Sequence, residues 1–350
     1  MTRRIIKSNI VELKKESIFV GDMSHNICRD DLIPKKYITP GINEKTFVNL
    51  KSFVDSPCKT NVEMALKLIE NGPQKLKPII QDDTDDIGNG NNFMKLCFSA
   101  PHIALNHLEK FPKEIETILT QENNCGQNVF EVACVTCPAI SKKMIKLYPD
   151  TLRPILSHKD KNARNAFLNA CMWQPEVVTL MCKKFPEELE KIITHEDVDG
   201  RNALIYICLF CPTNVLTTVI NQFPNEARLS LDQLDTFGWN AFLYALTNKK
   251  TNSAKCLVEC CKDKIASMIN YEDKNSETAL SIACDVTPPM AVQIILNFSD
   301  IISWHKKNVT ALGNLFNNSQ NDTFMGATEL DALFFNIPPH VLFDISTNYI

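Results

Sequence analysis

A short frame recurs along the chain at a nearly constant spacing, and this spacing restricts the fold more than any other feature. In each copy a small polar residue precedes an apolar run that ends in cysteine, as in GQNVFEVAC, ARNAFLNAC and GRNALIYIC. The polar residue recurs at Asn91, Asn128, Asn165, Asn202, Asn240, Thr278 and Thr310, in steps of 37, 37, 37, 38, 38 and 32 residues. A fixed period of this size is typical of an array of stacked units, each of which packs on its neighbours.

Each unit is predicted to begin with a helix. Asn and Thr are favoured N-cap residues because their side chains accept a hydrogen bond from the free amides of the first turn. After Asn165, the residues Phe167, Ala170 and Cys171 follow at the three- and four-residue spacing of one buried helical face. The cysteine that ends each face is therefore predicted to be a small buried residue with no ligand. The aligned cysteines are Cys97, Cys134, Cys171, Cys208 and Cys284.

A second helix is predicted to begin four residues after each cysteine, at a proline. Proline suits the first turn of a helix, where its missing N–H would have had no partner. These prolines are Pro101, Pro138, Pro175 and Pro212. The second helix is predicted to end at an aromatic–proline pair such as Phe185-Pro186, since the residue before proline disfavours the α conformation. The link that follows has the pattern P-x-x-[LI]-x-x-I, which predicts one further turn of helix.

The same pattern sets the expected domain boundaries. PQKLKPII at 73–80 resembles PDTLRPIL at 149–156, and PHVLFDI at 339–345 matches the link once more. We therefore expect an array over residues 41–350, with roughly eight units by this count and degenerate first and last units. Residues 1–40 are expected to be an N-terminal leader or cap.

The units resemble ankyrin repeats, which consist of two antiparallel helices and a projecting loop with a signature near D-x-x-G-x-T-P-L-H-x-A. DVDGRNALIYI carries Asp197, Gly200 and Leu204 in register, and NSETALSIA carries Thr278, Ala279, Leu280 and Ala283. The proline and histidine of the signature are absent, and the unit is about four residues longer than the family's. The tetratricopeptide repeat ranks second, because its Trp and Leu-Gly positions are missing. The resemblance implies an all-α, ankyrin-like helical-repeat solenoid with a period of 37–38 residues.

Composition limits the class of partner. The 350 residues carry a net charge of −4, with a pI near 6.0, which gives no overall attraction to nucleic acid or to an anionic membrane. The uncharged stretch 202–225 is long enough to cross a bilayer, but Pro212 and three asparagines interrupt it. We interpret it as the helix pair of one unit, and we expect no membrane partner.

The fourteen cysteines suggest zinc or disulfides, and neither interpretation is favoured. The CxxC pairs Cys134/Cys137 and Cys208/Cys211 are two units apart, too far for one tetrahedral site. The N-terminus lacks the apolar stretch of a secretion signal, so reduced thiols in the cytoplasm are the simpler account. We expect no metal, no cofactor and no catalytic residue, although a Cys–His nucleophile pair remains open. His158 and His195 share one position in the link and are interpreted as solvated loop residues.

In ankyrin-like stacks the concave face and the loop tips bind protein partners, and the resemblance implies the same non-enzymatic scaffold role here. Aromatic and arginine side chains outside the core are suited to anchor such an interface. The candidate partner-binding residues are Arg164, Trp173, Arg201, Tyr206, Phe210, Trp239 and Tyr244. We expect Arg201, Tyr206 and Trp239 at the surface. Trp173 and Phe210 fit the surface and packing under the link equally well.

Two further points stay open. The segment NIPPHVLFDI resembles the opening of an F-box helix, so an adaptor that recruits a ubiquitin ligase is an alternative function, although the segment also fits the repeat's own link. Divergent arrays of this composition resemble those of large DNA viruses and intracellular bacteria, which engage host proteins; a protist origin is equally open. We expect a monomer in the cytoplasm, including that of a host cell, bound to a protein partner.

Overall fold

The computed structural model describes residues 90–247, 250–319 and 333–348. Within these ranges the regular secondary structure is helical, apart from an isolated bridge between Glu122 and Asn128, so the predicted all-α class is confirmed there. The expected leader, residues 1–40, and the first degenerate unit lie outside the described residues. The chain divides between Ile192 and Ile193 into two compact units. We call residues 90–192 the N-terminal unit and residues 193–348 the C-terminal unit.

The helices of the N-terminal unit fall into groups of a first helix, a second helix and a short link helix. The first helices are α5 (Asn92–Ser99), α8 (Val129–Thr136) and α11 (Ala166–Trp173). The second helices are α6 (Pro101–Lys110), α9 (Pro138–Leu147) and α12 (Pro175–Lys184). The links are α7 (Pro112–Thr117), α10 (Pro149–Leu152) with the 3₁₀ turn η1 (Arg153–Ile155), and α13 (Pro186–Ile192).

The C-terminal unit repeats this order. Its first helices are α14 (Ala203–Phe210), α17 (Ala241–Thr247) and α20 (Ala279–Val286), and its second helices are α15 (Thr213–Gln222), α18 (Thr251–Cys260) and α21 (Pro288–Phe298). The links are α16 (Pro224–Asp232) and α19 (Lys262–Met268). The helices α22 (Lys306–Ser319) and α24 (Pro339–Asn348) follow.

The predicted N-caps are confirmed at six of the seven positions. The side chains of Asn91, Asn128, Asn165, Asn202, Asn240 and Thr278 each accept a hydrogen bond from the backbone N–H three residues later. The prediction for Thr310 is wrong, because α22 begins at Lys306. There His305 precedes the helix and its Nδ1 accepts from the N–H of Asn308 at 3.3 Å. The Asn308 side chain donates to the Ser303 carbonyl, so the chain enters the helix one turn early.

The prolines and aromatic residues act as predicted. Helices α6, α9 and α12 begin at their proline, while Pro212 lies one residue before α15. The aromatic residues Phe111, Tyr148, Phe185 and Phe223 follow the last residue of a second helix, and their N–H groups donate to the carbonyl four residues earlier. The predicted helical turn in the links is also present, as α7, α10, α13 and α16.

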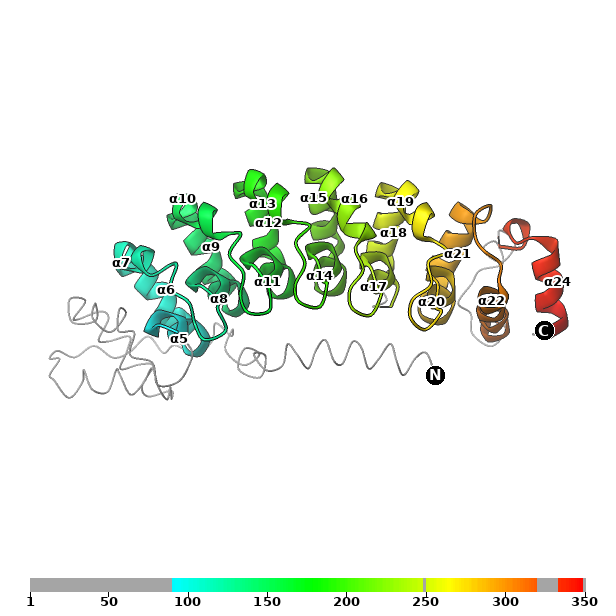
Figure 1. Ribbon diagram of the computed structural model, residues 1–350, viewed down its shortest axis with the longest axis horizontal. Helices are drawn as coiled ribbons and strands as arrows, with labels where there is room; N and C mark the ends of the chain where they lie inside the picture. Colours follow the sequence, from blue (N-terminus) through cyan, green and yellow to red (C-terminus); the bar gives the residue numbers. More distant parts are fainter. Residues whose placement is uncertain (1–89, 248–249, 320–332, 349–350) are drawn as a thin grey trace, which may run out of the picture. The chain divides into compact units, whose positions relative to one another are not determined.

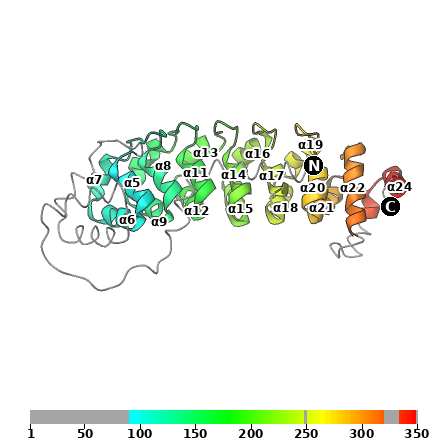
Figure 2. The same cartoon turned by 90° about the horizontal axis from the view of Figure 1, so that it is seen from below.

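Equivalent helices of successive repeats pack side by side within each unit. In the N-terminal unit α8 lies between α5 and α11, and α9 lies between α6 and α12 (Figure 1). In the C-terminal unit α17 lies between α14 and α20, and α18 lies between α15 and α21 (Figure 2). The first helices α8 and α17 are therefore each covered by two equivalents of their own unit and by their own second helix. As a result, every residue from Ala241 to Thr247 in α17 is buried, where the sequence predicts one buried face.

The uncharged stretch 202–225 forms the helix pair α14 and α15, with Cys211 and Pro212 between the two helices. None of the helices in the described ranges has the length and apolar character required to cross a membrane.

Candidate functional site

The loop before each first helix is built around one carboxylate or amide oxygen. In five successive loops the Oδ1 atom of Asn123, Asp160, Asp197, Asp235 or Asp273 accepts hydrogen bonds from the backbone N–H groups two and four residues later, at 2.7–2.9 Å. Of these five residues, only Asp197 could be recognised in the sequence, as part of the ankyrin-like signature. The shared pattern fixes the loop backbone and leaves Oδ2 of each aspartate available for a second partner.

The fourth position of the same loops has a left-handed backbone. Glycine fills it at Gly126, Gly200 and Gly238, with φ of 75–80°, whereas Ala163 and Ser276 adopt φ of 57° and 54°. A Cβ atom at Gly200 would lie 3.1 Å from the Cα atom of Asp235. The loops of neighbouring repeats therefore approach each other closely at this position.

In the C-terminal unit, tyrosines of the first helices occupy the remaining aspartate oxygens. Tyr206 donates its hydroxyl hydrogen to Oδ2 of Asp197 at 2.5 Å, and Tyr244 does the same to Asp235 at 2.5 Å. Burial raises the pKa of Tyr244, and the neighbouring Asp235 raises it further. The phenol therefore remains a hydrogen-bond donor at neutral pH.

Trp239 and Arg201 complete this polar network. The indole Nε1 of Trp239 donates to Oδ2 of Asp273 at 2.8 Å, and its ring meets the Tyr244 ring edge-on at 5.2 Å between centroids. Arg201 contacts Asp199 at 3.1 Å. The two tyrosines therefore join their first helices to the loops, and Trp239 joins its own loop to the loop of the next repeat.

The expected surface position of three candidates is wrong. Tyr206, Trp239 and Arg201 are 0%, 2% and 3% exposed, and Tyr244 is also fully buried. The hydroxyls of the two tyrosines and the indole N–H of Trp239 are buried without large cost because each donates to a loop aspartate. The sequence signal for this role was the aspartate nine residues before each tyrosine, which recurs for both pairs.

Three candidates retain exposed surface. Arg164 is half-buried beside Asp160 in its loop, and Trp173 is the half-buried last residue of α11. Phe210 is the half-buried last residue of α14, and its ring stacks on Tyr206 at 6.2 Å between centroids. Trp173 and Phe210 occupy the same repeat position in different units. In both cases the end of a first helix presents an aromatic edge.

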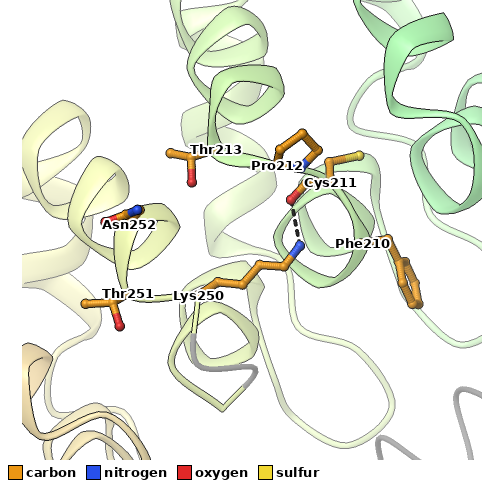
Figure 3. Close-up of a pocket in the computed structure, with 7 residues that line it drawn as sticks. All are labelled: Phe210, Cys211, Pro212, Thr213, Lys250, Thr251 and Asn252. Carbon is orange, nitrogen blue, oxygen red and sulfur yellow. Dashed lines mark hydrogen bonds between the residues drawn. The ribbon is translucent and has the colours of Figure 1, made fainter.

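A cavity of about 700 Å³ opens beside Phe210 in the C-terminal unit. Its walls come from the end of α14 and the starts of α15 and α18, as Figure 3 shows. The lining residues are Phe210, Cys211, Pro212, Thr213, Lys250, Thr251 and Asn252. Phe210 could be selected from the sequence but Lys250 was missed, because the adjacent lysines Lys249 and Lys250 in a polar stretch of sequence carry no signal without their neighbours in space. Phe210 and the cavity together form the candidate site, which we call the Phe210 cavity.

The aligned cysteines are buried as predicted. Cys97, Cys134, Cys171 and Cys208 are 0% exposed and Cys284 is 5% exposed. Burial raises the pKa of the Cys134 and Cys208 thiols well above the usual range. Across the described ranges, no three His, Cys, Asp or Glu side chains are grouped as metal ligands would be.

His158 is not a solvated loop residue, in contrast to the prediction. Its Nδ1 lies 3.0 Å from a carboxylate oxygen of Glu131, and its Nε2 lies 2.9 Å from Glu122. Glu131 is fully buried, and it also accepts the backbone N–H of Asn128 at 2.7 Å. Burial raises the pKa of Glu131 to about 8, partly opposed by the Asn128 N–H and by His158. Burial lowers the pKa of His158, but the two glutamates outweigh it and the pKa is raised.

Comparisons with known proteins add little to this geometry. No protein-family model matches the sequence, and no curated protein matches it. Among solved structures, the chain is similar to one in the complex of the Bd0816 predatory endopeptidase from Bdellovibrio bacteriovorus with the immunity protein Bd3460. The identity is 15% and the TM-score 0.41, over 60% of this chain and 97% of that chain. A likeness at this level supports no conclusion about fold or function.

Proposed function

We propose that the protein is a non-enzymatic scaffold of ankyrin-like repeats that binds a protein partner through the ends of its first helices. One observation carries this proposal: the first helices are buried along their length, but Trp173 and Phe210 leave an aromatic edge exposed where the helix ends. Half-exposed aromatic side chains are frequent anchors of protein interfaces. In this proposal four buried candidates stabilise the fold beneath the binding surface and do not contact the partner. They are Arg201, Tyr206, Trp239 and Tyr244.

The proposal also assigns the array to the ankyrin-like solenoid type. Its support is the sequential packing of first helix on first helix and second helix on second helix in each unit. The loops before the first helices and the free cysteine thiols fit the same assignment and a reducing compartment. We propose a monomer in the cytoplasm.

The test uses the full chain as bait and a matched set of alanine variants. Phe210→Ala and Trp173→Ala should each weaken partner retention about thirtyfold, which corresponds to the roughly 2 kcal/mol of an interface anchor. Their helix content and melting temperature should match those of the wild type. Phe335→Ala is the control, because Phe335 is 92% exposed and belongs to neither first-helix end. Equal retention by all three variants would refute the proposal.

A second candidate function is a C-terminal adaptor for a ubiquitin ligase. Phe335 and Phe343 are 92% and 67% exposed beside the IPP motif, which favours docking there. Against it, Val341 and Ile345 are buried, as the repeat's own link pattern requires. The same bait experiment decides between them, since Phe343→Ala and Phe335→Ala should then remove the ligase and Phe210→Ala should not.

A further inference from the structure

Lys250 is a half-buried cation that forms no ion pair with a carboxylate in the described part of the chain. It lies immediately before α18, and its Nζ donates to the carbonyl oxygen of Cys211 at 2.6 Å (Figure 3). An ammonium group has three N–H donors, and the Cys211 carbonyl uses one of them. No carboxylate of residues 90–247, 250–319 or 333–348 forms an ion pair with it. The charge therefore faces the Phe210 cavity uncompensated.

Another repeat shows that the charge is not needed to join the helices. Gln174 occupies the equivalent place immediately before α12. Its Nε2 donates to the Ala133 carbonyl at 2.7 Å, and its Oε1 accepts from Ser141 at 2.7 Å. A neutral amide thus joins a second helix to the first helix of the preceding repeat, at a carbonyl within α8, whereas Lys250 reaches the carbonyl of Cys211 just after α14. The positive charge of Lys250 requires a different explanation.

Burial makes that charge costly. Burial lowers the pKa of Lys250, because the ammonium loses part of its hydration. A partly dehydrated charge attracts a counter-ion more strongly than an exposed one does. An anion that enters the cavity would therefore recover part of the lost hydration energy.

The walls of the cavity indicate what kind of anion fits. Phe210 and Pro212 supply apolar surface, and Thr213, Thr251 and Asn252 supply polar groups. In Figure 3 Phe210 and Asn252 lie on opposite sides of the Lys250 side chain. A volume of about 700 Å³ accommodates an amino-acid side chain together with its backbone. Among the described residues that line the cavity, Lys250 is the one cation, and a single ammonium balances one negative charge, which suits a carboxylate better than a phosphate dianion.

We propose that the Phe210 cavity binds an acidic side chain of the partner protein, with its carboxylate on Lys250 and its methylene groups against Phe210. This inference rests on the proposed scaffold function and names the chemistry of the bound residue. The substitution Lys250→Gln separates charge from structure, since glutamine at the equivalent place already donates to a carbonyl. Lys255→Gln is the matched control, because Lys255 lies on the same helix, is 56% exposed and pairs with Glu259.

The experiment follows the ε-carbon signals of the full chain labelled with [ε-¹³C]lysine, in which the Lys250 signal is the one lost in Lys250→Gln. The probe is N-acetylglutamate N-methylamide at constant ionic strength. Saturable movement of the Lys250 signal is expected, with at least fivefold weaker binding of the neutral glutamine analogue. Phe210→Ala should weaken the probe severalfold, and Lys255→Gln should leave it unchanged. A probe that moves Lys250 no more than sodium chloride does would overturn the proposal.

Two further probes test the source of the charge. Acetylglycylglycine presents a C-terminal carboxylate, and inorganic phosphate presents a dianion. Tighter binding of either one than of the capped glutamate would overturn the assignment to an acidic side chain. The two proposals can fail separately. If Phe210→Ala loses the partner but the wild type does not bind the probe, the acidic-side-chain inference is refuted. If the wild type binds the probe but Phe210→Ala retains the partner fully, the scaffold function is refuted.

Discussion

The fourth residue of the first helix is tyrosine in α14 and α17 of the C-terminal unit but valine and asparagine in α8 and α11 of the N-terminal unit. Tyr206 and Tyr244 fasten each helix to the loop before it through a phenol–aspartate hydrogen bond. The N-terminal unit lacks these phenols and instead joins α8 to a later link through Glu131 and His158. The same repeat frame is therefore held by two chemistries. Phenols do not titrate near neutral pH, whereas imidazole and a buried carboxyl do.

The largest expected effect comes from comparing Trp239 of the C-terminal unit with Trp173 of the N-terminal unit. Trp239→Ala should cost about 3–5 kcal/mol of unfolding free energy, because it leaves a cavity and removes the donor to Asp273. Trp173→Ala should cost less than about 1 kcal/mol, because its side chain is half-exposed. Urea unfolding of both variants measures the difference. Equal losses would show that the units do not differ in this way.

The tyrosine network is tested next by a pair of phenylalanine variants. Tyr206→Phe should cost roughly 1.5–3 kcal/mol, since the lost hydrogen bond has a charged acceptor. Tyr148→Phe in the N-terminal unit should cost roughly 0.5–1.5 kcal/mol, since Tyr148 donates to the neutral carbonyl of Pro112. Hydrogen exchange of amides in α14 and α9 locates each loss. A smaller loss at Tyr206 than at Tyr148 would contradict the assigned strength of the network.

Acid should destabilise the N-terminal unit through His107. This residue is 3% exposed, and neither ring nitrogen has a hydrogen-bond partner in the described part of the chain. Burial, with a smaller effect of Lys110, lowers its pKa to about 4. The unfolded chain thus binds more protons between about pH 4 and 6.5, and the stability present above pH 6.5 should fall by about 3 kcal/mol as the pH drops through this window. His107→Phe should remove that slope in urea unfolding, and an unchanged slope would exclude His107 as its source.

Base should weaken the same unit through the glutamate–histidine pair. The raised pKa values of Glu131 and His158 mean that the folded unit binds more protons than the unfolded chain near neutral pH. Stability should therefore fall as the pH rises from about 4.5, the ordinary pKa of Glu131, to its folded value of about 8, by on the order of 1 kcal/mol after allowance for solvent screening at His158. The part of this window above pH 6.5 is free of the opposite effect of His107. Hydrogen exchange in α8 should report the loss, with α14 unaffected. Glu131→Gln should reduce the dependence of stability on pH in this window. A stronger dependence in the variant would contradict the role assigned to Glu131.

The smallest expected effect is common to both units. Ala163→Gly and Ser276→Gly relieve a left-handed backbone that three sister loops give to glycine. Each should gain about 0.5 kcal/mol, because the relieved strain slightly exceeds the added entropy of the unfolded chain. Thermal melting of the single and double variants measures the gain. A loss at either position would show that its side chain makes a stabilising contact.

Most of the helix frame could be predicted because it depends on local chemistry. Asn165 caps α11 with its own side chain, and Pro175 starts α12 through its own ring. These interactions lie within one turn of the helix, so short stretches of sequence specify them. The prediction for Thr310 is wrong because the start of α22 depends on a contact outside its own turn. The side-chain oxygen of Asn308 accepts a hydrogen bond from Thr278 in the preceding repeat.

The candidate site could be predicted only in part. Phe210 was selected for its type and its position after the buried face, and it does line the cavity. Tyr206 was selected by the same reasoning and is fully buried. The two positions differ by one helical turn. Periodicity alone predicts one buried face, and it does not show that the other faces of the helix are also buried.

The sequence by itself determined the all-helical class, the helix starts and ends and the burial of the aligned cysteines, because capping, proline geometry and helical periodicity act within a few residues. The tertiary structure decided which side chains are exposed, how Tyr206 and Glu131 join helices to loops or links, and that Lys250 and Phe210 line one cavity. These depend on contacts longer than one helical turn: Tyr206 bonds Asp197 nine residues earlier, Glu131 meets His158 27 residues later, and Lys250 meets Cys211 39 residues earlier. The distance between such groups is set by the loops and by the packing of one repeat on the next.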